Sequence, residues 1–169
     1  MSAEELTALL TLATAMSFTP GPNTTLSTAL AANFGLRRTL GFIAAVPTGW
    51  TLMMLACGLG LGALVTALPL LRWAVKFVGI GYLVWLAWQL ANTRSLRATN
   101  GATLHVGFRQ GVMLQFLNIK AWMLALALAA GWVTSAAGQP AANPGERLLL
   151  VCVLMAVFAA TSNLAYALV

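Results

Sequence analysis

The sequence contains few charged residues, and carboxylates are the rarest of them. Only three residues are acidic, namely Glu4, Glu5 and Glu146, and charged residues make up 7% of the chain against 60% for hydrophobic ones. This composition leaves too little polar surface to cover a soluble globule. A mean hydropathy of +0.88 agrees with this reading, so we expect an integral membrane protein.

The scarcity of reactive groups excludes several classes of function. The sequence shows no Ser-His-Asp set, paired carboxylates, phosphate-binding loop or metal-ligand cluster, so we expect no enzyme, cofactor or metal ion. Its two cysteines, Cys57 and Cys152, lie in apolar runs and cannot build a disulfide framework. The nine Lys and Arg are scattered in ones and twos, which is typical of membrane-protein loops and not of a surface for nucleic acid.

Five apolar runs are long enough to cross a bilayer, which requires about 20 residues for a helix. They cover residues 6–32, 40–64, 68–91, 110–133 and 147–169. The short connections leave no room for a soluble domain, so we expect residues 1–169 to form one all-α transmembrane domain, a polytopic helical bundle. Basic residues are more frequent after the first and third runs, and the positive-inside rule then places the N-terminus outside the cytoplasm.

The first apolar run is interrupted by the segment Thr19-Pro20-Gly21-Pro22-Asn23. Because Pro20 and Pro22 remove backbone donors and clash with the preceding turn, we expect a helix break at bilayer depth. Such a break is tolerated only where it is buried in protein or lines a polar cavity. A half-helix that begins at Pro22 would direct unpaired N–H groups and its positive end at an anion. The predicted binding residues here are Pro20, Gly21, Pro22, Asn23 and Thr24, and the alternative is a kink without a ligand.

The fourth run contains the polar residues Gln115, Asn118 and Lys120, which we also predict to bind substrate. An ammonium at bilayer depth costs several kcal/mol unless it meets water or a partner. Lys120 either pairs with a substrate carboxylate or snorkels to the cytoplasmic surface from the start of a helix. The two amides either line a pathway or hydrogen-bond neighbouring helices. On an unbroken helix Asn118 and Lys120 diverge by about 200°, which makes a shared cavity harder to form.

Glycines are frequent in the second and third runs, and we expect them to permit close approach of helices. These residues are Gly41, Gly49, Gly58, Gly60, Gly62, Gly79 and Gly81. We expect Arg72 and Lys76 to snorkel from the start of the third helix, and His105 to lie solvated in a loop. Burial in apolar surroundings is the expectation for both cysteines.

Taken together, these motifs resemble the LysE/RhtB family of amino-acid and metabolite exporters. The matching segments are residues 19–23, the series Gly35, Gly41 and Gly49, residues 76–83, and Gly111 followed by residues 118–120. The resemblance implies a multi-pass exporter in the bacterial inner membrane, usually with six helices in two inverted three-helix repeats, driven by the proton gradient. The chain departs from the family in having Ile119 where proline is common, and in lacking the usual last helix.

The leading hypothesis is an exporter of a small amino acid or derivative, whose carboxylate binds at the break after Pro20. Its expected partners are this substrate and the lipid bilayer, with proton coupling and homo-oligomerisation left open. Because the apolar runs contain no carboxylate, proton coupling would use Lys120, groups of the substrate or another route. The alternatives are a membrane thiol–disulfide carrier that uses Cys57 and Cys152, and a non-transporting fragment that assembles with another chain.

Overall fold

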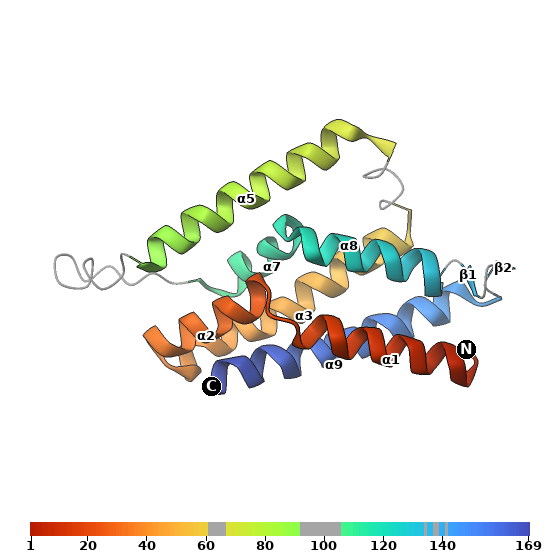
Figure 1. The fold of residues 1–169 in the computed structure, drawn as a ribbon, viewed down its shortest axis with the longest axis horizontal. Coiled ribbons are helices and arrows are strands. Elements are labelled where there is room, and N and C mark those ends of the chain that lie inside the picture. The colour runs from red at the N-terminus through yellow and green to blue at the C-terminus, as the bar shows by residue number, and fades with distance from the viewer. Residues whose placement is uncertain (61–66, 92–105, 134, 137–138, 141) are drawn as a thin grey trace.

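The computed structural model describes residues 1–60, 67–91, 106–133, 135–136, 139–140 and 142–169. Its helices are α1 (Ala3–Phe18), α2 (Pro22–Phe34), α3 (Leu36–Gly58), α5 (Pro69–Ala91), α7 (Phe108–Leu117), α8 (Ile119–Leu128), the π-helix η1 (Ala129–Val133) and α9 (Pro144–Leu168). The antiparallel pair β1 (Ser135–Ala136) and β2 (Gln139–Pro140) precedes α9. In Figure 1 the helices other than α5 gather into one bundle, and α5 lies along its outside. The expected all-α architecture is confirmed.

The predicted break in the first apolar run is present. Helix α1 ends at Phe18 and α2 begins at Pro22, so that Thr19, Pro20 and Gly21 separate two half-helices. Pro22 occupies the first turn of α2, where its missing N–H costs no hydrogen bond. The chain then turns into α3 through Gly35, whose φ of 80° favours glycine.

The fourth run is also broken, which the sequence left undecided. Helices α7 and α8 are bent by 68° at Asn118, so the divergence of about 200° expected for an unbroken helix does not apply. Asn118 has an extended backbone, and its side-chain Oδ1 accepts the Lys120 N–H at 3.1 Å. This is an N-cap, which satisfies a donor that the first turn of a helix leaves unpaired. An asparagine cap therefore makes the break here without a proline.

Two of the described helices, α3 and α9, are long and apolar enough to cross a membrane. Helix α7 together with residues 119–133 makes a third if the bent pair is one span. Large apolar side chains such as Leu70, Val153 and Val157 are exposed, as expected for surfaces that face lipid. The fold is that of a multi-pass membrane protein, while the number of five spans stays a prediction.

Close helix approach is confirmed at three of the predicted glycines. A Cβ atom at each position would lie under 3.0 Å from an atom of a neighbouring helix, and these residues are Gly49, Gly58 and Gly79. For Gly41 and Gly81 the prediction was wrong, because no heavy atom of the described residues lies within 4 Å of such a Cβ. Gly60 instead forms a turn with a φ of 102°. Gly62, His105 and the side chain of Arg72 lie outside the described residues.

The main hydrophobic core lies where α1, α3, α8 and α9 meet. Both cysteines belong to it, with Cys57 6% exposed and Cys152 4% exposed, so their expected burial is confirmed. Leu9, Met53 and Leu128 are fully buried beside them in the same cluster. This core packs α1 and α8 together with α3 and α9, and the hydrogen bond from Lys120 Nζ to the Thr19 carbonyl joins the two helix breaks.

Candidate functional site

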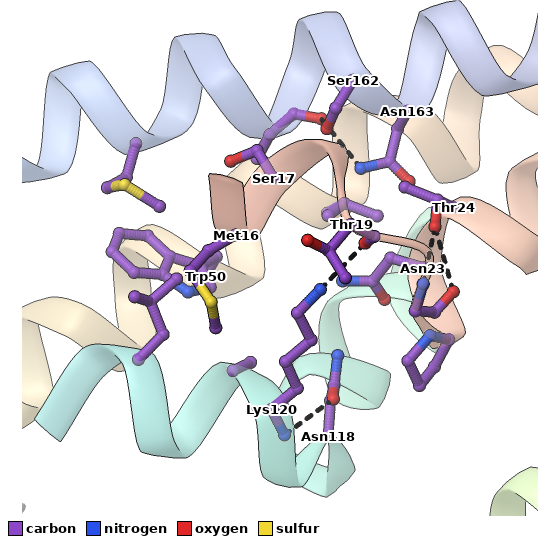
Figure 2. Close-up of a pocket in the computed structure, with 17 residues that line it drawn as sticks. Met16, Ser17, Thr19, Asn23, Thr24, Trp50, Asn118, Lys120, Ser162 and Asn163 are labelled. Carbon is purple, nitrogen blue, oxygen red and sulfur yellow. Dashed lines mark hydrogen bonds between the residues drawn. The ribbon is translucent and has the colours of Figure 1, made fainter. Parts of the chain in front are cut away.

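A cavity of about 70 Å³ lies where the α1–α2 break meets the α7–α8 break (Figure 2). Side chains from α1, α2, α3, α8 and α9 line it. Six of the eight predicted binding residues are among them, namely Gly21, Pro22, Asn23, Thr24, Asn118 and Lys120. The other two, Pro20 and Gln115, do not line the cavity. Residues that are far apart in sequence are thus brought to one polar site.

Lys120 crosses from α8 to the end of α1. Its Nζ donates a hydrogen bond to the Thr19 carbonyl at 2.9 Å, and Figure 2 shows the side chain running beside the break. A Cβ on Gly21 would lie 3.3 Å from Nζ and 3.4 Å from Cδ of Lys120. The φ of Gly21 is −158°, an extended backbone conformation that any residue adopts. The glycine therefore provides space for the lysine side chain, and the backbone conformation does not require it.

The N-terminus of α2 forms another part of the cavity wall, next to Lys120. The first N–H groups of a helix, here those of Asn23 and Thr24, have no acceptor within the helix. The Thr24 hydroxyl accepts the Gly21 N–H at 2.9 Å and donates to the Gly21 carbonyl at 3.1 Å, which fixes the entry into α2. The positive end of the helix dipole therefore lies at the cavity, a few ångströms from the Lys120 ammonium.

Asn118 adds a neutral donor. Its Oδ1 is occupied by the Lys120 N–H, so the side chain has only its NH₂ group to offer as a donor, and Figure 2 shows this nitrogen directed at the cavity. The wall built by α2 and α8 therefore presents an ammonium, an amide NH₂ and the N-terminus of a helix. Such a donor set suits an anion, and a carboxylate in particular.

Gln115 lies behind this wall and not in it. It is fully buried and exchanges two hydrogen bonds with Asn23, from Asn23 Nδ2 to its Oε1 at 2.8 Å and from its Nε2 to Asn23 Oδ1 at 3.1 Å. Its Nε2 also donates to the Gly111 carbonyl. Of the two roles left open for the amides, these bonds favour the structural one for Gln115, since they tie α7 to α2 and orient Asn23.

The opposite wall of the cavity comes from α9, and none of its residues was predicted from the sequence. Ser162 and Asn163 line the cavity and are 1% and 2% exposed. The Ser27 hydroxyl donates to Asn163 Oδ1 at 2.8 Å, which binds α9 to α2. These two residues interrupt the apolar run 147–169, and this is the same signal that identified Asn23 and Asn118. A third side of the cavity is apolar and consists of Met16, Trp50, Leu124 and Met155, with Val46 beside them.

Two broken helices that enclose a polar cavity in an apolar bundle, with a lysine in its wall, define a membrane transport protein. No group of His, Cys, Asp or Glu that could hold a metal ion occurs among the described residues. The chain belongs to the LysE type translocator family, whose sequence profile matches residues 14–160.

Relatives with known names are similar over much of the chain. A cysteine/O-acetylserine efflux protein of Klebsiella pneumoniae subsp. pneumoniae is 30% identical over 96% of this chain and 80% of its own length. Proteins of the same name from Salmonella choleraesuis and Escherichia coli O1:K1 are 34% and 37% identical, each over 65% of this chain and 55% of their own length. The chain thus matches about half the length of these two relatives. No solved structure matches it.

Proposed function

We propose that the chain exports a small amino acid or amino-acid derivative, whose carboxylate binds between Lys120 and the N-terminus of α2. The observation that carries the proposal is the convergence of this ammonium with the N-termini of α2 and α8 in one small cavity. The names of the relatives support a substrate of the size and charge of cysteine or O-acetylserine. We further infer that residues 1–169 form a single transport domain.

The dimensions of the cavity support a short substrate. At about 10–15 Å³ for each water-sized group, a cavity of about 70 Å³ admits roughly five to seven of them. This matches an amino acid with a short side chain. The apolar side, formed by Met16, Trp50 and Met155, would receive that side chain, because soft thioethers and an indole adapt to small polarizable groups.

We infer a location in the bacterial inner membrane with a periplasmic N-terminus, supported by the family and by the distribution of basic residues. Among the described residues that line the cavity there is no carboxylate, so proton coupling would use Lys120 or groups of the substrate. A thiol–disulfide carrier is disfavoured, because Cys57 and Cys152 are buried in the apolar core and do not line the cavity. Light scattering on the same preparation measures self-association and assembly with another chain.

Uptake of radiolabelled O-acetylserine into proteoliposomes tests this proposal. We expect Lys120→Gln to lower the affinity roughly tenfold to a hundredfold, which corresponds to the ~1.5–3 kcal/mol of a hydrogen bond to a charged group. Lys120→Arg should keep part of the activity, since it keeps the charge.

The matched control is Lys76→Gln, which changes the other lysine of the chain. Lys76 lies on α5 with its Nζ 4.8 Å from the centre of the Trp73 ring, and it does not line the cavity. This control should transport like the parent protein. No uptake by the parent, or full uptake by Lys120→Gln, would refute the proposal.

A further inference from the structure

The buried hydroxyl of Ser162 offers the cavity an acceptor and not a donor. Its Oγ donates to the Ala159 carbonyl at 3.2 Å. The amide nitrogen of Asn163 donates to the same carbonyl at 2.8 Å and holds it in place. A hydroxyl has one proton and two lone pairs, so the lone pairs of Ser162 Oγ are what remains for a bound molecule.

Two donors of the cavity, the Lys120 ammonium and the Asn118 amide, lie on the wall built by α2 and α8. Lys120 uses one of its three N–H groups on Thr19, and Asn118 has its oxygen occupied by the cap of α8. A molecule that touches both walls must therefore accept hydrogen bonds at one end and donate them at the other. With a cavity of about 70 Å³, these two ends belong to one small molecule.

An α-amino acid has this arrangement, because one carbon separates its carboxylate from its ammonium. We propose that Ser162 is the recognition residue for the α-ammonium group of the substrate, and that Lys120 and the α2 N-terminus hold the carboxylate. The inference rests on the proposed export function and adds a requirement to it, namely a free α-amino group. It assigns a specificity role to α9.

The lack of a negative side chain in the described lining of the cavity supports this assignment. No Asp or Glu is found among the described residues that line it, so the ammonium has no carboxylate to pair with. Neutral oxygens must accept the hydrogen bonds of the ammonium group. Ser162 supplies one such oxygen and is only 1% exposed. A hydrogen bond from a charged donor to such a buried oxygen is stronger than one between neutral groups.

The test compares L-cysteine with 3-mercaptopropionate, which is cysteine without its amino group, as competitors of O-acetylserine uptake into proteoliposomes under reducing conditions. For the parent protein we expect cysteine to compete roughly tenfold better or more, as one charged hydrogen bond implies. Ser162→Ala should remove this preference by weakening cysteine alone. Ser162→Thr, which keeps the hydroxyl, should retain it.

Thr161→Ala is the matched control, because Thr161 is the adjacent residue on α9. Its hydroxyl donates to the Val157 carbonyl at 2.8 Å, it is exposed, and it does not line the cavity. This variant should keep the preference for cysteine.

Three results distinguish a failure of the role proposed for Ser162 from a failure of the proposed export function. A preference that survives in Ser162→Ala, or an equal loss of affinity for both compounds, would overturn the role of Ser162 while uptake still supports amino-acid export. An inability of the parent protein to take up O-acetylserine would overturn both.

Discussion

At the scale of single residues, the site depends on the space that Gly21 leaves for Lys120. The lysine side chain passes so close to the break that a methyl group on Gly21 would press on both Nζ and Cδ. The bond from Nζ to the Thr19 carbonyl places the ammonium beside the N-terminus of α2. The glycine of this motif therefore positions a charge that belongs to another helix.

We predict that Gly21→Ala lowers the affinity for O-acetylserine by up to roughly tenfold, the equivalent of about one net hydrogen bond. The added methyl group would displace the ammonium by a few tenths of an ångström, and the extended backbone at this position tolerates alanine. Uptake kinetics in proteoliposomes measure the change.

The control for this substitution is Gly41→Ala, where a methyl group meets no heavy atom within 4 Å. It should leave the affinity unchanged. If Gly21→Ala and Gly41→Ala transport alike, the room left by Gly21 has no part in binding.

At the scale of elements, the second break is covered by α5. A Cβ on Gly79 of α5 would lie 2.1 Å from the Leu117 carbonyl oxygen, so the two backbones are in direct contact at the end of α7. Leu117 is the last residue before the cap at Asn118. Helix α5 thus packs on the point where α7 and α8 diverge.

We predict that Gly79→Ala destabilises the detergent-solubilised protein by ~1–3 kcal/mol, the usual cost of overpacking a tight contact. A backbone oxygen cannot rotate away as a side chain does, so α5 itself would have to move. Thermal unfolding followed by a fluorescence probe measures the effect.

Gly81→Ala, two residues along the same helix, is the control, since no heavy atom in the part of the chain that the structure describes lies within 4 Å of its Cβ position. Its unfolding temperature should equal that of the parent or exceed it, because alanine favours helix. Equal unfolding temperatures for the two variants would show that the contact between Gly79 and Leu117 is not tight in solution.

At the scale of the whole molecule, α1 is held by polar contacts at both ends. At its start, Glu5 forms an ion pair with Arg147 of α9 at 3.2 Å, and its carbonyl accepts the Trp132 indole N–H at 3.2 Å. At its end, the Tyr166 hydroxyl donates to the Phe18 carbonyl at 2.9 Å. These contacts fix the half-helix that forms one side of the cavity.

The Glu5 pair predicts an acid-dependent loss of stability. Hydrogen bonds from the Ser2 N–H and from Arg147 hold the pKa of the Glu5 carboxyl below its ordinary value of 4.5. Because the folded state lowers this pKa, the contribution is complete above pH 4.5 and is lost as the pH falls through the lowered value. The unfolding temperature should therefore fall as the pH is lowered below about 4.5.

Since the sequence has only three acidic residues, few other groups titrate in this range. We expect Glu5→Gln to be less stable at neutral pH and to lose most of the acid dependence. Glu4→Gln, which removes the neighbouring exposed carboxylate, should keep it. An unchanged acid dependence in Glu5→Gln would contradict the role assigned to this ion pair.

The sequence by itself determined the class of protein and the first break. The shortage of charged residues predicts a membrane protein, and the pair Pro20 and Pro22 breaks a helix because both prolines remove backbone donors and clash with the preceding turn. The first feature depends on overall composition and the second on residues adjacent in the chain. For this reason the predicted start of a half-helix at Pro22 is correct.

Only the tertiary structure decided which polar residues meet. The α7–α8 break needs the Asn118 side chain to cap Lys120, and α5 then covers the freed end of α7. Gln115, predicted to bind substrate, pairs with Asn23 and does not line the cavity, whereas Ser162 reaches the cavity from a helix near the end of the chain. Each outcome depends on which buried amide or hydroxyl finds a partner across helices, and local spacing cannot specify that partner.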